Sequence, residues 1–152
     1  MHSITLFKGA RNYMKSLIDA LSEKQLTTIP EGYNNHIFWH LGHVVVTQQL
    51  LHYRRSGLPL HIDENLIDLF KNGSSPRDWS DPPDPGRILS LLNTLPERLA
   101  QDYADERFKG ITFDGFTTRS GFELNSIDQA IVFNNYHEGI HAGYLMAMRR
   151  LV

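Results

Sequence analysis

Residues 35–55 read NHIFWHLGHVVVTQQLLHYRR, and the pattern of this stretch decides the fold class. Five of its polar side chains recur at helical spacing, which places them on one narrow stripe of a helix: His36, His40, His43, Thr47 and Arg54. Apolar residues border that stripe on both sides, so the helix is buried over most of its surface. The stripe faces either solvent or a polar cavity inside a bundle. Because metal sites in helical bundles are built from inward side chains, clustered histidine favours the cavity.

Three further segments show the apolar spacing of three and four residues that is typical of helices. We expect one at about 3–21, one that starts at Asp84-Pro85, and one from Asn125-Ser126 to the C-terminus. Between the second and third helices, residues 56–84 form a long connection with a short helix at about 64–71. The chain is therefore predicted to be a single all-α domain over 1–152, a four-helix bundle with a long crossover between helices 2 and 3. Fewer than a tenth of its residues should lie in strands.

Several local predictions accompany this outline. Residues 23–34 carry loop signals, and 108–124 form either a loop or a short hairpin. Asn35 is expected to cap the second helix, and Ser126 to form a capping box with Gln129. Pro96 should kink or split the third helix, with Thr94 capping the second piece. On the last helix, the stripe predicted to be buried contains Phe133, Ile140, Tyr144, Met148 and Leu151.

Composition excludes several classes of partner. The net charge of the 152 residues is -2, which gives no electrostatic reason to expect nucleic acid or an anionic membrane. No apolar run reaches the roughly 18 residues of a membrane span, and the first fifteen residues do not resemble a signal peptide. We therefore expect a cytoplasmic protein. Cysteine is absent, which removes disulfides, thiolate ligands and a cysteine nucleophile.

Two histidines on the last helix are the strongest chemical signal. His137 and His141 are four residues apart, so both imidazoles lie on one face within reach of a single ion. Two ligands do not complete a metal site, and a pair of hydrogen-bonded core histidines remains the alternative. The histidines of the second helix, His36, His40 and His43, are the candidates for a third ligand. By contrast, His2, His52 and His61 have no partner at ligand spacing.

The segment His137-Glu138-Gly139-Ile140-His141 also matches H-E-x-x-H, the pattern of zinc proteases. Those enzymes take a third ligand from downstream, and no His, Asp, Glu or Cys follows His141, so the protease interpretation is disfavoured. A di-iron bundle is rejected as well, because the second helix contains no Glu. Glu138 is the nearest candidate for a catalytic base, with a surface residue or an outer partner of the ligands as equal alternatives.

At this point the sequence resembles the DinB-like family of small bacterial proteins, in two windows. One is Trp39-His40-Leu41-Gly42-His43-Val44; the other runs from His137 through Arg149-Arg150-Leu151. The resemblance implies a four-helix bundle with a long crossover, often a homodimer. It also implies a divalent metal ion, commonly nickel or zinc, on three histidines that match His43, His137 and His141. His40 is the second choice on its helix.

Two functional hypotheses follow. In the first, the chain is a metal-dependent enzyme for a small molecule, such as a thiol S-transferase that uses a low-molecular-weight thiol, or a hydrolase. Family members with known activity include thiol S-transferases. In the second, it is a metal-stabilised, stress-related binding protein without turnover. A cavity that opens onto the metal would favour the enzyme, and a closed fourth coordination position would favour the structural role.

Overall fold

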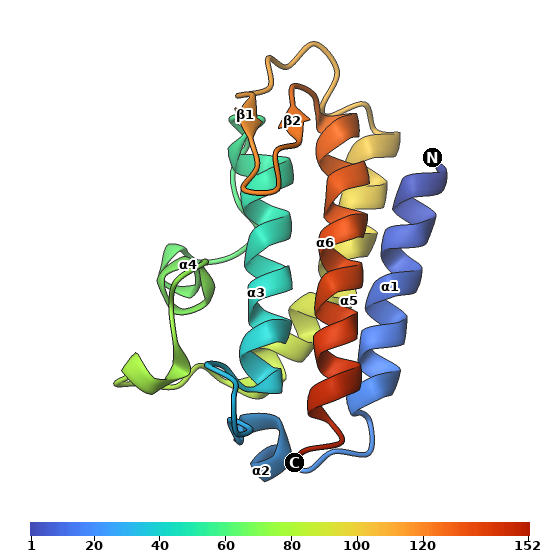
Figure 1. Cartoon of the computed structure of the whole chain (residues 1–152). Coiled ribbons are helices and arrows are strands. Elements are labelled where there is room, and N and C mark those ends of the chain that lie inside the picture. Colours follow the sequence, from blue (N-terminus) through green and yellow to red (C-terminus); the bar gives the residue numbers. More distant parts are fainter.

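Four long helices pack side by side in the computed structural model, which describes residues 1–152 (Figure 1). They are α1 (His2–Ile18), α3 (Ile37–Gln49), α5 (Pro85–Ala104) and α6 (Ile127–Met148). The shorter elements are α2 (Glu23–Thr27), α4 (Glu64–Phe70), a 3-10 turn (Pro76–Asp78) and the antiparallel hairpin of β1 (Phe116–Thr117) and β2 (Glu123–Leu124). Strands of two residues each confirm the prediction of a helical protein.

The topology of the bundle follows from its one long connection. Helix α6 packs against α1 and α3, and α5 packs against the same two helices. In Figure 1, α1 and α6 run in one direction while α3 and α5 run in the other. The connection over residues 55–84 returns the chain to the end where α3 began, which makes α3 and α5 parallel neighbours. The predicted four-helix bundle with a crossover between its second and third long helices is confirmed. No helix is long and apolar enough to cross a membrane.

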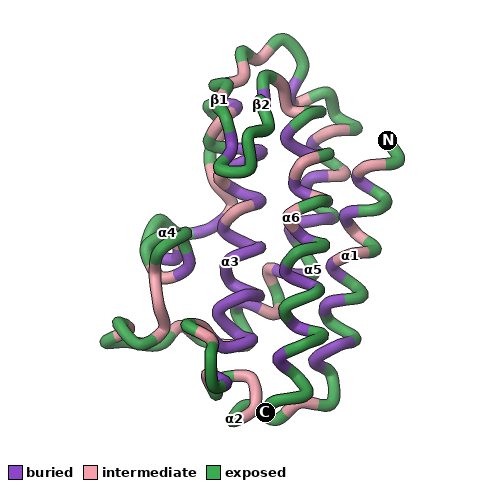
Figure 2. The backbone as a smooth tube through the Cα atoms, in the orientation of Figure 1, coloured by how far each residue is buried: buried purple, intermediate pink, exposed green.

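The main core lies where α3 meets the other helices. Nearly every residue of α3 is buried, whereas α1 and α6 alternate between buried and exposed positions (Figure 2). The fully buried side chains of this core include Met14, Ile37, Leu41, Phe70, Ile88 and Leu145. Burying each of them stabilises the fold by about 1.5–3 kcal/mol relative to exposure. A second cluster around Leu99 fills the opposite end of the bundle.

The capping residues at the helix ends agree in part with the predictions. Asp84 caps α5 by accepting from the amides of Gly86 and Arg87, and Ser126 caps α6 by accepting from the amide of Gln129. The return bond of the predicted capping box is displaced, because Gln129 Oε1 accepts from Asn125 N instead of Ser126 N.

Two local predictions are wrong, and a third is wrong in its alternative of a split helix. His36, and not Asn35, caps α3, because its Nδ1 accepts from the Trp39 amide at 2.9 Å. Residues 23–34 contain the short helix α2, which a capping box between Ser22 and Gln25 stabilises. Helix α5 is not split at Pro96, and the Thr94 hydroxyl donates to Ser90 O within the same helix rather than capping a second piece.

The face that α6 buries also differs from the prediction. Ile140, Tyr144 and Leu151 are 39%, 44% and 58% exposed, Phe133 is half-buried, and of the predicted stripe Met148 alone is buried. The buried side chains of α6 are Ala130, Ile131, Asn134, Glu138, His141, Ala142, Leu145 and Met148. Apolar residues surround this helix, so their spacing does not select a face. Polar residues on α1 and α3 contact the polar side chains of α6, so the face of α6 that carries those side chains is the buried one.

Candidate metal centre

Three histidines converge between two helices, α3 and α6. The Nε2 atom of His137 lies 3.2 Å from Nε2 of His43 and 3.2 Å from Nε2 of His141. One ring nitrogen from each residue lies within 4.8 Å of the others. His43 and His141 are buried and His137 is half-buried. The structure thus brings together the three residues that the sequence pointed to.

The spacing of His137 Nε2 from the other two ring nitrogens fits a shared divalent ion. With metal–nitrogen bonds of about 2.0–2.1 Å at tetrahedral angles, two imidazole nitrogens lie about 3.3 Å apart. The two measured separations of 3.2 Å are close to that value. Three neutral imidazoles suit zinc and nickel, and they leave a fourth position for another ligand.

Contacts behind two of the three rings, those of His43 and His141, hold these rings in their orientation. Nδ1 of His43 lies 2.6 Å from the carbonyl oxygen of Phe70, so this nitrogen carries the proton and donates it, which leaves Nε2 free to bind a metal. Nδ1 of His141 lies 2.9 Å from Nδ1 of His40, which places His40 behind the site rather than in it. The ring of Trp39 stacks on His43 at 4.7 Å. Nδ1 of His137 has no hydrogen-bond partner within the chain.

Gly42 explains how the Phe70 carbonyl comes so close to Nδ1 of His43. The ring of Phe70 lies directly on the backbone of α3, and a Cβ atom at position 42 would stand 2.2 Å from its Cε1 atom. Only glycine leaves room for that contact. The glycine between His40 and His43 therefore seats the end of α4 against α3, where Phe70 accepts from His43.

Burial keeps the imidazoles in the neutral form that binds metals. Burial, together with the smaller effect of neighbouring charged groups, lowers the pKa of His137 from 6.5 to about 3 and that of His40 to about 4. Burial also lowers the pKa of His43 and of His141. At neutral pH all four rings therefore present a lone pair without first losing a proton.

Glu138 lies beneath the histidines in a buried ion pair. Its side chain is fully buried, and Arg11 of α1 donates to both carboxylate oxygens at 2.7 and 2.8 Å. Arg11 also donates to the carbonyl of Val44, and Asn134 donates to Glu138 at 3.4 Å. Burial raises the pKa of Glu138, and the guanidinium of Arg11 opposes that rise. With both oxygens engaged, Glu138 ties α6 to α1 and α3, so this geometry does not support the predicted role as a catalytic base.

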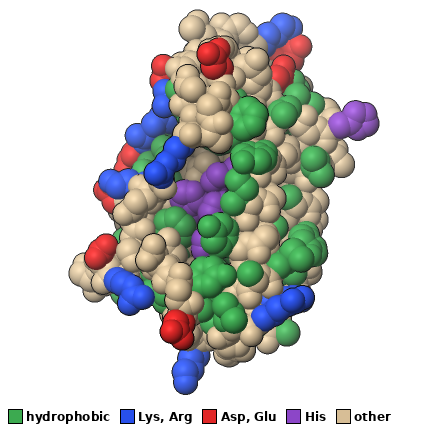
Figure 3. Space-filling model, viewed as in Figure 1, with side chains coloured by type: hydrophobic (Ala, Val, Ile, Leu, Met, Phe, Trp, Pro, Cys, Tyr) green, Lys and Arg blue, Asp and Glu red, His purple; other side chains and the backbone are tan.

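A cavity of about 470 Å³ opens onto two of the histidines, His43 and His137. One part of its wall is apolar and consists of Leu50, Leu51, Phe116, Phe133, Tyr136 and Ile140. The other part is polar and consists of Thr47, Lys71, Asn72, Thr118, Arg119 and Ser120. In Figure 3, histidine side chains are visible in a hollow with basic side chains on one rim and hydrophobic side chains on the other. The cluster of three histidines can therefore be reached from outside.

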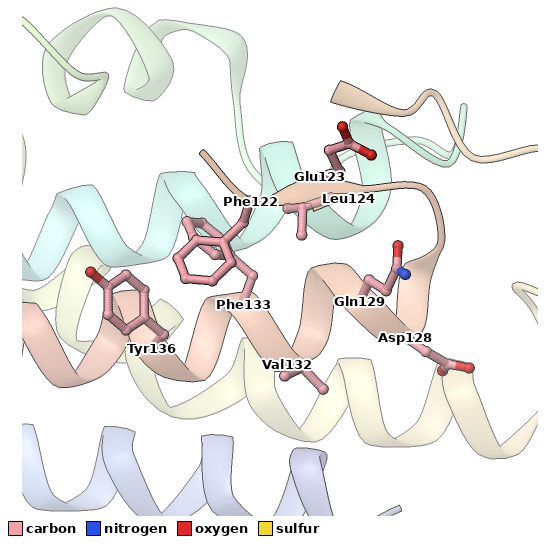
Figure 4. Close-up of a pocket in the computed structure, with 8 residues that line it drawn as sticks. All are labelled: Phe122, Glu123, Leu124, Asp128, Gln129, Val132, Phe133 and Tyr136. Atoms are coloured by element: carbon pink, nitrogen blue, oxygen red, sulfur yellow. The ribbon is translucent and has the colours of Figure 1, made fainter. Parts of the chain in front are cut away.

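A second hollow of about 410 Å³ lies on the far side of two of these aromatic residues (Figure 4). Phe122 of the hairpin packs against Phe133 and Tyr136 of α6, with ring centres 5.8 and 5.7 Å apart. Phe133 and Tyr136 line both hollows. This aromatic cluster fixes the hairpin on α6 and separates the second hollow, which contains no histidine, from the metal centre.

Sequence reasoning missed three parts of the site. Phe70 contacts a histidine 27 residues away in the chain, and Arg11 contacts a carboxylate 127 residues away. No local sequence pattern reveals contacts between such distant residues. Thr47 belonged to the predicted polar stripe but had no role assigned. Its hydroxyl lies 3.3 Å from Nε2 of His43, at the floor of the cavity. The available signal for a role of Thr47 was its place on this stripe, one turn after a histidine.

Comparisons with known proteins agree with this description. The sequence profile described as "DinB superfamily" matches residues 6–145. No curated protein matches the sequence. A solved structure of YfiT from Bacillus subtilis, described as "a probable metal-dependent hydrolase with an unusual four-helix bundle topology", is similar with a TM-score of 0.60. It shares 16% sequence identity, over 98% of this chain and 85% of the YfiT chain.

Proposed function

This chain belongs to the DinB superfamily, and from that membership together with the geometry of the site we propose that it is a metal-dependent enzyme acting on a small molecule. The cavity that reaches His43 and His137 carries this proposal. A purely structural metal site is closed by four protein ligands, whereas a catalytic site keeps one position for water or substrate. The cavity therefore favours the enzyme over a metal-stabilised binding protein without turnover.

Hydrolysis is the reaction that the site supports best. A divalent ion held by these three imidazoles would lower the pKa of a bound water to about 7 and would so supply a nucleophile at neutral pH. Thr47, with its hydroxyl 3.3 Å from Nε2 of His43, is placed to hydrogen-bond a group at the fourth position. The Phe70 carbonyl and His40 keep the rings of His43 and His141 oriented. The description of YfiT as a probable metal-dependent hydrolase supports the same class.

Thiol transfer is the second candidate. The open position that accepts water would equally accept an external thiol as its thiolate, and the chain has no cysteine to compete for the metal. A hydrolase turns over an ester or amide without any added thiol, whereas a transferase consumes an electrophile only when a thiol is present.

The experiment compares metal-loaded wild type with His137→Ala and with a control, His2→Ala, whose residue is exposed and remote from the site. We assay zinc and nickel forms against ester and amide panels, and against electrophiles with and without low-molecular-weight thiols. We expect turnover that a chelator abolishes, that added metal restores, and that His137→Ala lacks while His2→Ala retains it. A fully metal-loaded wild type without turnover in any arm would favour the non-catalytic alternative.

We also propose that two copies of the chain associate. The outward side of α6 is exposed and uncharged over several turns, through Val132, Tyr136, Gly139, Gly143 and Ala147. A two-fold dimer needs such a self-complementary surface, because the same residues meet from both copies. Sedimentation should give twice the mass of the 17.5 kDa chain, with Gly143→Glu sedimenting as a monomer. A wild type that stays monomeric at all concentrations would exclude the dimer.

A further inference from the structure

The cavity above the histidines is basic on one side and contains no acidic residue. Among its fourteen lining residues, the charged side chains are Lys71 and Arg119, and neither Asp nor Glu is present. Arg119 makes no ion pair and no side-chain hydrogen bond within the chain, whereas Lys71 donates to Asp68 at 2.7 Å. Asp68 offsets the charge of Lys71, so the wall of the cavity keeps about one positive charge without a partner.

The fold holds Arg119 at this place. It lies in the turn that joins β1 to β2, where Thr118 O accepts from Gly121 N at 2.9 Å and Thr118 N donates to Phe122 O at 2.8 Å. Gly121 has a φ of 84°, a conformation that glycine adopts without strain. The backbone under Arg119 is therefore fixed by a tight turn, while its exposed guanidinium is free to meet a ligand.

The base of the hairpin is equally well attached. A π-helical turn, Leu50–Arg54, follows directly after α3, and the carbonyl of the next residue, Arg55, accepts from Asp114 N at 2.6 Å. Its guanidinium donates to the Asp114 carboxylate at 2.5 Å and covers the ring of Phe116 at 4.2 Å. Phe116 is thus held as an apolar wall of the cavity by the same hairpin that carries Arg119.

We propose that the cavity takes a small organic monoanion with an apolar body. The carboxylate of such an acid pairs with Arg119, assisted by Lys71, and its apolar part lies against Phe116, Phe133 and Ile140. A single unopposed positive charge favours a carboxylate over a phosphate dianion. This inference names the substrate class of the proposed function and so rests on it. The histidines then face the part of the molecule that reacts.

The experiment measures the binding of matched probes by calorimetry, to both the zinc-loaded and the metal-free chain. The probes are 4-phenylbutyrate, its neutral counterpart 4-phenylbutan-1-ol, and butyrate, which lacks the ring. We expect wild type to bind 4-phenylbutyrate about tenfold more tightly than either other probe, in both metal states. Metal-free binding shows that the carboxylate is not simply a ligand of the zinc ion.

Three variants test which side chain causes the preference for the acid over the alcohol. Arg119→Gln should bring the acid and the alcohol within about twofold of each other, and Lys71→Gln should have a smaller effect because Asp68 already opposes that charge. Arg150→Gln is the control, since Arg150 is exposed, unpaired and outside the cavity, and it should behave like wild type.

Two outcomes overturn the inference. One is equal or absent binding of acid and alcohol by wild type, and the other is an Arg119→Gln variant that keeps the full preference. Zinc titration of the same samples separates this failure from failure of the proposed function. Zinc binding without an acid preference removes the substrate class alone, whereas a chain that binds no zinc removes the metal-dependent function.

Discussion

Replacing Gly42 with alanine perturbs the metal centre without touching a ligand. The added Cβ would stand 2.2 Å from Cε1 of the buried Phe70 ring, and carbon atoms in contact lie about 3.5–4.0 Å apart. The ring must therefore move by more than 1 Å. Because the Phe70 carbonyl accepts the proton of His43 Nδ1 at 2.6 Å, that movement lengthens or breaks the bond that orients His43.

Two effects of the Gly42→Ala substitution can be sized from the structure. Overpacking a well-filled core costs about 1–3 kcal/mol of stability. Loss of a hydrogen bond behind a metal-bound histidine typically lowers metal affinity about 10–100-fold. We therefore expect a folded but less stable chain whose zinc affinity falls by that factor, although all three histidines remain.

The assay pairs zinc titration against a competing chelator with urea unfolding. Leu99→Ala is the control, since Leu99 is fully buried in the second core cluster. It should lose about 2–5 kcal/mol of stability and keep its zinc affinity while folded. If Gly42→Ala binds zinc within twofold of wild type, or if Leu99→Ala loses as much affinity, the reasoning about Phe70 is refuted.

Three further predictions concern stability. Leu145→Ala should cost about 2–5 kcal/mol in urea unfolding and Ile140→Ala less than about 1 kcal/mol, because only Leu145 is fully buried; equal losses would contradict the burial of α6. Burial lowers the pKa of His52 to about 3, so below pH 6.5 the unfolded chain binds the extra proton and this residue removes about 1.4 kcal/mol of stability per pH unit. His52→Phe should therefore show a shallower decline of stability with acid than wild type, and an unchanged slope would show that His52 is not buried as the neutral form. Glu138→Ala should cost about 3–5 kcal/mol because it leaves Arg11 buried and unpaired, whereas the double change Glu138→Leu with Arg11→Met should recover most of that loss.

Local patterns were enough to predict the long helices and the histidine pair of α6. Helical spacing is a property of neighbouring residues, so the four long helices, the cap at Asp84 and the pair His137 and His141 could all be found in the sequence. The stripe on α3 offered several histidines as a third ligand, and the period of the helix did not choose among them. The resemblance to the DinB-like family selected His43, which the structure brings together with the pair.

The remaining features depend on contacts between distant segments. The buried face of α6 was predicted wrongly because that helix is apolar on all sides, and what turns Glu138 inward is Arg11, 127 residues away. The seat of Phe70 on Gly42 and the hairpin that carries Arg119 arise in the same way, from packing of the crossover and of residues 108–124 onto α3. A sequence shows which residues are available for such contacts, but the choice of partner is made by the assembled bundle.

The central claim is that His43, His137 and His141 hold one divalent ion, and metal titration of histidine variants tests it most directly. The metal-stripped wild type and four single His→Ala variants, which include His40→Ala, are titrated with zinc and with nickel. We predict one ion per wild-type chain and a collapse of binding in each ligand variant, because two imidazoles do not hold the ion as three do. His40→Ala should lose only about 10–100-fold, since His40 contacts the site through Nδ1 of His141. Binding that His40→Ala abolishes and His43→Ala retains, or that all four variants retain, would contradict the assignment.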